Sequence, residues 1–229
     1  AAIKNNGELW TWGWNWKGVV GNEDTGSPHG FAPAKLMDDV VSVSLGYLHA
    51  AAIKRDGSLW TWGENSHGEL GDGTTNDSGN YEPKMIMNNV AAVSLGTGYS
   101  AAIDCDGALW MWGDNSKGQF GNGTTESSTT PIKVMDGVSA VSLGGSHTGV
   151  IMTDGSLLTW GWNLDGQLGN GTTEDSRVPV KVMDDVASIS FRCCNSSAVK
   201  KDGTLWVWGD GAYNQLGVTS WDQLKPVQY

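Results

Sequence analysis

The stretch LWTWGENSHGELGDGTT, from Leu59 to Thr75, decides the fold because close copies of it recur along the chain. Each copy contains a Trp-Gly pair, and the glycines of these pairs are Gly13, Gly63, Gly113, Gly161 and Gly209. Successive glycines are 50, 50, 48 and 48 residues apart. Eight residues after each one comes a second glycine, at Gly21, Gly71, Gly121, Gly169 and Gly217. Self-similarity at a nearly fixed spacing of this size predicts a repeat architecture.

Each repeat reads as a series of short strands. Alternating, β-branched runs such as VSVSL are followed by a second apolar run such as AAAIK and then by the LWTW segment. An Asn-Gly or Asp-Gly pair separates AAIK from LWTW at residues 6–7, 56–57, 106–107, 154–155 and 202–203. Such pairs predict tight hairpins, and we expect positive φ at both residues of each pair. No segment has a helical period of useful length.

A fourth strand in each repeat begins near a proline, as in PIKVM after Thr130. Because proline donates no ladder hydrogen bond, this strand is expected at a sheet edge. Four antiparallel strands in about 50 residues are typical of a propeller blade. Neighbouring blades cover both faces of each sheet, so Trp60 and Trp62 are expected to fill the wedge between blades, each burying on the order of 200 Å². The sequence therefore predicts an all-β propeller, with residues 1–229 forming one domain of about five blades.

The composition excludes several classes of partner. The chain of 229 residues has a formal net charge of −11, which disfavours binding to nucleic acid or to an anionic membrane. No apolar run of roughly 18 residues is present, so insertion into a membrane is not expected. Cys105, Cys193 and Cys194 match neither a disulfide framework nor zinc-ligand spacing. The chain begins AAIKNNGELW, without an initiator Met or an apolar leader, so we expect any targeting segment to lie outside it.

The motif HAAAIKRDGSLWTWGENSHGELGDGTT, with its proline and its VSLG run, resembles the RCC1-like (regulator of chromosome condensation) repeat family over the whole chain. This resemblance implies a β-propeller, usually of seven blades, closed by one blade completed from both chain ends. The LWTWG motif is similar to that of bacterial RCC1-repeat proteins. The family also implies two activities: nucleotide exchange on a small GTPase, and light sensing through Trp-Arg pairs in a loop that here reads Gly145-Ser146-His147-Thr148. Without Trp or Arg in that loop, light sensing is not expected.

Five Trp-Gly hairpins but only four VSLG-type strands are present, whereas seven blades need about 350 residues at this repeat length. Three interpretations stay open: a piece of a larger propeller, a truncated chain, or a five-bladed ring with an imperfect seam. An incomplete blade also predicts self-association, since unpaired strands recruit other strands. The last repeat diverges, with Arg192 in place of glycine and Asn214 in place of the glycine at position 68 of the second repeat.

Two loops of each repeat are expected on the same side of the sheet, because antiparallel strands alternate in direction. One loop joins the VSLG and AAIK strands and contains Tyr47; the other begins directly after Trp-Gly. Positions that vary on a repeated frame are where repeat proteins place recognition. The predicted partner-binding residues are Trp14, Trp16, Tyr47, His49, Glu64, Tyr99, Asp114, His147, Trp162 and Asp210. For the histidines a structural role, bonded within the loop, is the stronger interpretation.

The hypothesis for function is a non-catalytic protein-interaction module that needs no cofactor and no metal. His49 and His147 lack a third metal ligand, and the Asp-Gly carboxylates are explained by turns rather than by glycoside hydrolysis. No nucleophile elbow or phosphate loop is present. The alternatives are a glycan-binding propeller, whose exposed tryptophans would stack on sugars, and an exchange factor for a small GTPase.

Overall fold

The computed structural model describes residues 1–22, 29–218 and 222–229. It contains nineteen strands and one short 3-10 helix, Trp16–Gly18, within these ranges. The strands are β1 (Ala2–Ile3), β2 (Leu9–Trp14), β3 (His29–Met37), β4 (Val40–Leu45), β5 (His49–Lys54), β6 (Leu59–Asn65), β7 (Asn76–Met87), β8 (Val90–Leu95), β9 (Tyr99–Asp104), β10 (Leu109–Gly113), β11 (Ser128–Met135), β12 (Val138–Leu143), β13 (His147–Met152), β14 (Leu157–Gly161), β15 (Ser176–Met183), β16 (Val186–Phe191), β17 (Asn195–Lys200), β18 (Leu205–Gly209) and β19 (Gln223–Gln228).

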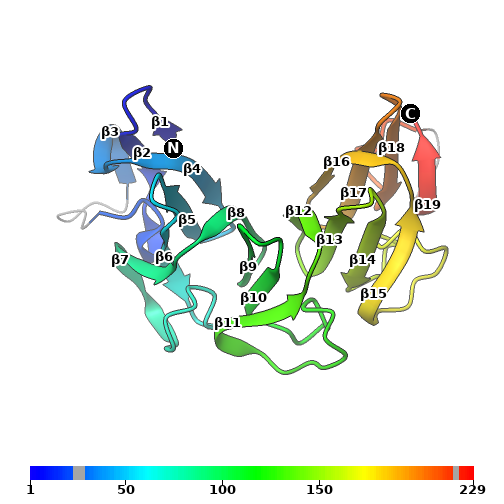
Figure 1. Cartoon of the computed structure of the whole chain (residues 1–229), viewed down its shortest axis with the longest axis horizontal. Helices are drawn as coiled ribbons and strands as arrows, with labels where there is room; N and C mark the ends of the chain where they lie inside the picture. The colour runs from blue at the N-terminus through cyan, green and yellow to red at the C-terminus, as the bar shows by residue number, and fades with distance from the viewer. Residues whose placement is uncertain (23–28, 219–221) are drawn as a thin grey trace. The chain divides into compact units, whose positions relative to one another are not determined.

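These strands form five antiparallel sheets in chain order (Figure 1). The first sheet has three strands, β1-β2-β3, and the second to fifth have four each: β4 to β7, β8 to β11, β12 to β15 and β16 to β19. Sequential strands are neighbours throughout, so every sheet is a meander. The predicted all-β fold of four-stranded propeller blades is confirmed, with five blades in this chain.

The chain folds as two compact units. One consists of Ala1–Cys105, Trp110–Asp114 and Ser127–Lys133, and the other of Asp106–Leu109, Asn115–Glu126 and Val134–Tyr229. We call them the N-terminal and C-terminal units and describe each by itself.

The proline-containing strands are edge strands, as predicted. Pro83 lies in β7, Pro131 in β11 and Pro179 in β15, and each of these strands is the last of its sheet. The register shifts along them, for example between Thr61 and Gly63 where β6 pairs with β7. An edge strand tolerates such bulges because no further strand pairs with its outer side. For the same reason it tolerates proline, which has no N–H to donate.

The structure corrects the predicted geometry of the Asp-Gly hairpins. Gly57 has φ +80°, but Asp56 is not among the residues with positive φ. The Gly57 N–H donates to the Lys54 carbonyl over 2.9 Å, and the Lys54 N–H donates to the Ser58 carbonyl over 2.9 Å. This is a three-residue loop that ends in one left-handed glycine, not a two-residue turn. The Asp56 carboxylate instead accepts hydrogen bonds from the Ser58 N–H and hydroxyl, which explains the preference for Asp before glycine.

The second tryptophan of each LWTW segment joins successive sheets. Trp62, Trp112, Trp160 and Trp208 are fully buried. Their indole N–H groups donate, over 2.7 to 2.9 Å, to the main-chain carbonyls of Val19, Glu69, Gln119 and Gln167 respectively. Each carbonyl belongs to the preceding repeat, so every one of these bonds ties two neighbouring repeats together. The wedge-filling role predicted from sequence is confirmed for Trp62 and holds for its three counterparts. Trp60 is only half-buried, with the Lys54 ammonium 4.7 Å from its ring, and Trp12 in the first sheet is 43% exposed.

A glycine makes room for each buried indole. A Cβ atom at Gly71 would lie 2.8 Å from the Trp112 Nε1 atom, and one at Gly169 would lie 2.8 Å from Trp208 Nε1. Real Cβ atoms do not approach other atoms this closely, so any side chain there would displace the ring. The second glycine of the repeat is therefore required by the indole of the next repeat.

Candidate functional site

A buried asparagine organises the loop that follows the Trp-Gly pair in each of the first four repeats. These residues are Asn15, Asn65, Asn115 and Asn163, each at most 4% exposed. The Asn163 side-chain oxygen accepts from the Leu168 N–H over 2.9 Å, while its amide group donates to the carbonyls of Thr172 and Glu174 over 3.0 Å. Asn65 makes the corresponding bonds to the Leu70 N–H and the Thr74 carbonyl. One carboxamide thus fixes the loop from inside in each of these four repeats.

The residues on either side of this asparagine lie at the surface. In the first sheet they are Trp14 and Trp16, which are 54% and 48% exposed. Their rings stack with centroids 5.3 Å apart and an angle of 21° between the planes. In the fourth sheet they are Trp162, which is half-buried, and Leu164, which is 64% exposed. The variable positions are therefore held in place by the constant asparagine between them.

The two loops that were expected on one side of each sheet do lie together. The Glu64 N–H donates to the Leu48 carbonyl over 2.9 Å, and the Asp114 N–H donates to the Gly98 carbonyl over 2.8 Å. In the C-terminal unit the Trp162 N–H donates to Ser146 and the Asp210 N–H to Cys194, both over 2.9 Å. In each case the residue after Trp-Gly is tied to the loop between the first two strands.

The structure corrects the surface position predicted for three residues. His49, Tyr99 and His147 are at most 1% exposed, so none of them can contact a partner in this conformation. The His49 Nε2 atom lies 3.0 Å from the Ser100 hydroxyl, which itself donates to the Glu69 carbonyl over 2.7 Å. Because the hydroxyl proton is used on that carbonyl, His49 Nε2 is the donor. His147 and Ser196 repeat the arrangement, with Ser196 donating to the Gln167 carbonyl.

These imidazoles are buried as neutral groups. Desolvation by burial lowers the pKa of His49 to about 4, while a hydrogen bond to the Tyr99 backbone acts in the opposite direction. Burial lowers the pKa of His147 to about 3. His147 also stacks on Phe191, with ring centroids 5.1 Å apart. The two histidines are thus structural parts of the inter-sheet packing, which agrees with the stronger of the two sequence interpretations.

The remaining predicted residues fall into two separate sets. The N-terminal unit carries Trp14, Trp16 and Tyr47, the last 72% exposed, together with the half-buried Glu64 and Asp114. The C-terminal unit carries the half-buried Trp162 and Asp210. Within the described ranges, no group of three or more His, Cys, Asp or Glu side chains is arranged to hold a metal ion. In the same ranges, no helix has the length and apolar character needed to cross a bilayer.

Sequence reasoning missed the asparagine and two exposed apolar residues. Asn15, Asn65, Asn115 and Asn163 recur at the second position after Trp-Gly, so the repeat alignment itself contained the signal. Leu164 and Tyr213, which is 87% exposed, sit in loops at positions that differ from repeat to repeat. Only the outward direction of these side chains in the structure identifies them.

Comparison with known proteins identifies the family of this chain. The RCC1-like domain family matches residues 1–229, which is the whole chain. The chain belongs to the RCC1-like family. The resemblance predicted from the repeat motif is therefore confirmed. No curated protein matches the chain.

Solved structures of RCC1-like propellers share this fold. Human WBSCR16 is 23% identical, with a TM-score of 0.85 over 97% of this chain and 66% of that protein. Prp20p from Saccharomyces cerevisiae, whose binding to Gsp1p and histones has been examined, is 20% identical, with a TM-score of 0.87 over 100% of this chain and 62% of that protein. Yeast RCC1 (Prp20) bound to Kap60 gives 20% identity and a TM-score of 0.85, over 100% and 61%. This RCC1-like chain thus spans between 61% and 66% of the length of these relatives.

Proposed function

We propose that this RCC1-like chain is a non-catalytic protein-interaction module, and that the contact is centred on the segment that follows the Trp-Gly pair of β2 in the first sheet, which we call the tryptophan loop. The observation that carries the proposal is the stacked, half-exposed pair of Trp14 and Trp16. Two indoles held together at a surface are costly to leave in water, and tryptophan is enriched among the residues that dominate binding energy. The corresponding residues in the second repeat are Glu64 and Ser66, so the fold itself does not need aromatic side chains there.

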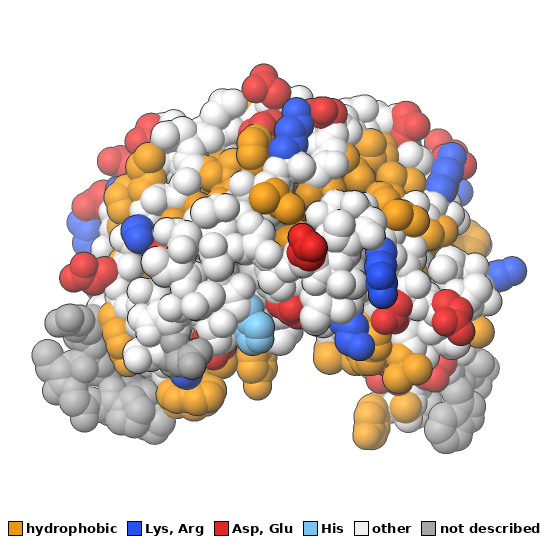
Figure 2. Space-filling view, turned by 90° about the horizontal axis from the view of Figure 1, so that it is seen from below, with side chains coloured by type: hydrophobic (Ala, Val, Ile, Leu, Met, Phe, Trp, Pro, Cys, Tyr) orange, Lys and Arg blue, Asp and Glu red, His pale blue; other side chains and the backbone are white. Residues whose placement is uncertain are grey.

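The charge of the chain favours a partner that presents basic side chains. The formal net charge is −11, and such a field steers cationic surfaces toward the molecule. Indole faces also attract Lys and Arg, as the Lys17 ammonium shows by lying 5.5 Å from the Trp16 ring. On the described surface drawn in Figure 2, acidic and basic side chains are interspersed, with hydrophobic side chains gathered between them. This supports local recognition of apolar and basic groups rather than of a polyanion.

Prp20p and its complex with Kap60 show that RCC1-like propellers bind other proteins. They support the class of function proposed here but not a particular partner, since identities near 20% reflect the fold alone. The exchange-factor alternative rests on family resemblance, and glycan binding rests only on the exposure of the tryptophans.

The test compares the partners of three forms of the purified chain: wild type, the double variant Trp14→Ala/Trp16→Ala, and the control Tyr229→Ala. Tyr229 is 70% exposed but lies outside the loop, so it controls for the loss of an exposed aromatic side chain elsewhere. Affinity capture followed by mass spectrometry should give a reproducible protein set that the double variant loses and the control keeps. Identical sets from all three forms would show that this loop is not the contact. Retention on glycans that is lost with the same double variant would instead favour the glycan-binding alternative.

A further inference from the structure

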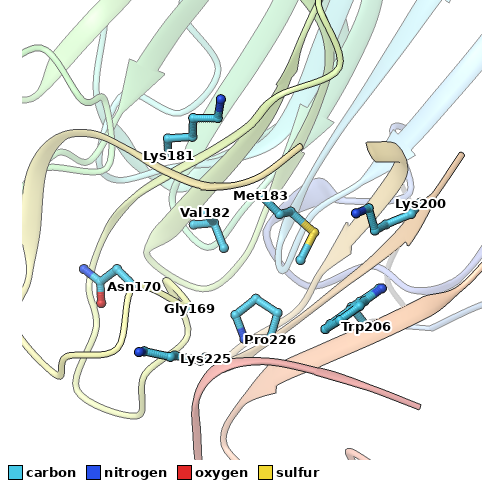
Figure 3. A pocket seen from close by; sticks show the side chains of 9 residues that line it. All are labelled: Gly169, Asn170, Lys181, Val182, Met183, Lys200, Trp206, Lys225 and Pro226. Carbon is cyan, nitrogen blue, oxygen red and sulfur yellow. The ribbon is translucent and has the colours of Figure 1, made fainter. Parts of the chain in front are cut away.

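The C-terminal unit contains a pocket, and none of its lining residues belongs to the tryptophan loop. This pocket of about 380 Å³ opens between the fourth and fifth sheets, and Figure 3 shows the side chains that line it. Val182 and Met183 come from β15, Trp206 from β18 and Pro226 from β19. Lys181, Lys200 and Lys225 surround this apolar group from different sides (Figure 3). The volume is at the lower end of the range found for small-molecule sites.

The three lysines concentrate positive charge in an otherwise acidic chain. The Lys181 ammonium lies 2.6 Å from the Asp184 carboxylate, which raises the pKa of Lys181. Lys200 and Lys225 make no ion pair within the described part of the chain. The stem of Lys225 crosses Gly171, where an added Cβ atom would lie 2.6 Å from the Lys225 Cε atom. The glycine therefore leaves room for this lysine beside the pocket.

Trp206 presents a free aromatic face at the same place. Its indole N–H donates to the Thr204 hydroxyl over 3.0 Å, which fixes the ring and satisfies its one donor. At the same position in the first two repeats, the rings of Trp10 and Trp60 are covered by lysine ammonium groups at 3.9 and 4.7 Å. Lys200 occupies the repeat position of Lys54, yet within the described residues no cation lies over Trp206. Both the ring face and the Lys200 ammonium are thus available to a ligand.

The other repeats show that the lysines are not required by the fold. At the positions of these three lysines the first pair of repeats has Lys35, Lys54 and Glu82, the second has Met85, Asp104 and Thr130, and the third has Lys133, Met152 and Val178. The number of lysines is therefore two, none and one. Only the last pair of repeats in this sequence combines three lysines with a tryptophan.

We propose that this pocket binds a small organic anion, made of a flat apolar ring that carries one phosphate or carboxylate group. The ring would lie against Trp206, Met183 and Pro226, and the anionic group would lie between the Lys200 and Lys225 ammonium groups. The carboxylates of Asp184 and Asp154 act on Lys181, and that of Asp202 acts on Lys200, so these three oppose the anion. More distant acidic groups oppose it weakly, because exposed charges are screened beyond roughly 8 Å at physiological ionic strength. The proposal goes beyond the interaction module and shares no residue with it.

The experiment is isothermal titration calorimetry with four probes on the purified chain. Adenosine 5′-monophosphate and 2-naphthyl phosphate combine a ring with a phosphate, adenosine lacks the charge, and inorganic phosphate lacks the ring. We expect one saturable site for the first two probes, with Kd between about 10 μM and 1 mM, and at least tenfold weaker binding of the other two.

Two variants locate the site. The double variant Lys200→Gln/Lys225→Gln should raise the Kd of both ring phosphates by about tenfold or more, because a charge-assisted hydrogen bond is lost on each side of the anion. The matched control Lys54→Gln removes a lysine at the same repeat position and should leave Kd unchanged within twofold. Near-ultraviolet circular dichroism confirms that both variants are folded.

Three outcomes would overturn the proposal. The first is that neither ring phosphate binds with a Kd below about 1 mM. The second is that inorganic phosphate or adenosine binds as tightly as the combined probes, because then ring and charge are not recognised together. The third is equal loss of binding in the Lys54→Gln control, which would place the site elsewhere.

Discussion

Among single residues, the two buried histidines show where sequence reasoning reached its limit. A histidine in a surface-side loop at a recurring position suggested either recognition or loop bonding, and the spacing could not decide between them. The decision depends on Ser100 and Ser196, which lie in the following repeat and bring a hydroxyl to within 3.0 Å of each ring. Such contacts between repeats are set by packing, which one repeat read alone does not contain.

The depressed histidine pKa values predict loss of stability in acid. The unfolded chain takes up a proton near pH 6.5, whereas His49 and His147 stay neutral until about pH 4 and 3 in the folded state. The unfolded state therefore binds more protons, and stability that is complete above pH 6.5 is lost as the pH falls. Between pH 7 and pH 5 the free energy of unfolding should fall by ~2 kcal/mol for each histidine, as measured by urea denaturation.

The control is the change of either histidine to asparagine, which the fifth repeat carries at Asn195. His49→Asn or His147→Asn should reduce the pH dependence by the share of one histidine. A slope unchanged from that of wild type would show that these two rings do not cause the acid sensitivity.

Glu69 gives the opposite pH dependence. It is 1% exposed, and burial raises the pKa of its carboxyl group although the side chain accepts a hydrogen bond from the His67 N–H over 2.7 Å. As the pH rises, the unfolded chain ionises first, so the folded state loses stability between the unfolded and the folded pKa. Gln119 and Gln167 occupy this position in later repeats and make the same contact without a charge.

Glu69→Gln should therefore stabilise the chain at pH 7 and have a smaller effect at pH 4, as measured by thermal melting against wild type at each pH. The reverse change, Gln119→Glu, should destabilise the chain at pH 7. Equal effects at both pH values would mean that folding does not shift the pKa of this carboxyl group.

Among the elements, the strands and hairpins were predictable and the loop interiors were not. The alternation of VSVSL, the Asp-Gly pairs and the prolines located every strand type in the sheet order that the structure shows. The turn geometry was predicted wrongly, because Asp56 caps Ser58 instead of adopting positive φ. The loop after the third strand was recognised as variable, but its rigidity comes from Asn163 and its counterparts, whose partners lie five to eleven residues away.

Removing that asparagine tests the loop as an element. Asn163→Ala leaves the Leu168 N–H and two carbonyls without their partner, so we expect a loss of about 2 to 4 kcal/mol in the free energy of unfolding and faster proteolysis within residues 164–175. The neighbouring Leu164→Ala removes a side chain that is 64% exposed and should change stability by less than about 0.5 kcal/mol. Equal protease sensitivity in the two variants would contradict the clamping role of Asn163.

On the scale of the whole molecule, each sheet is stabilised mainly by the sheet next to it. Inside the N-terminal unit, Trp112 packs with Ile53, Leu59 and Leu95 from two successive sheets and donates to Glu69. In the C-terminal unit, Trp208 packs with Leu157 and Phe191 in the same way. The repeat spacing predicted this architecture from sequence. It did not predict the lysine pocket, because the lysines come from three strands and converge only once two sheets are packed.

Trp112→Phe should reveal this dependence on neighbours. The ring volume is largely kept, but the 2.8 Å bond to the Glu69 carbonyl is lost, so the free energy of unfolding should fall by about 1 to 3 kcal/mol. Because stability in repeat proteins is a sum of local and nearest-neighbour contributions, the denaturant transition should also broaden. Trp110→Phe serves as control, since the half-buried Trp110 bonds Asp104 within its own sheet. A sharp transition in Trp112→Phe, shifted no more than in the control, would argue against coupling through the indole.

The bond between each indole and the carbonyl of the repeat before it also has a consequence for how such a gene can change. Every complete repeat offers one carbonyl to its successor and one indole to its predecessor, so a copied repeat placed between two others finds both partners ready. Duplication or loss of whole segments of 48 or 50 residues preserves all of these pairs, whereas a break inside a segment separates an indole from its carbonyl. Lineages that carry this array are therefore expected to differ in length by whole repeats.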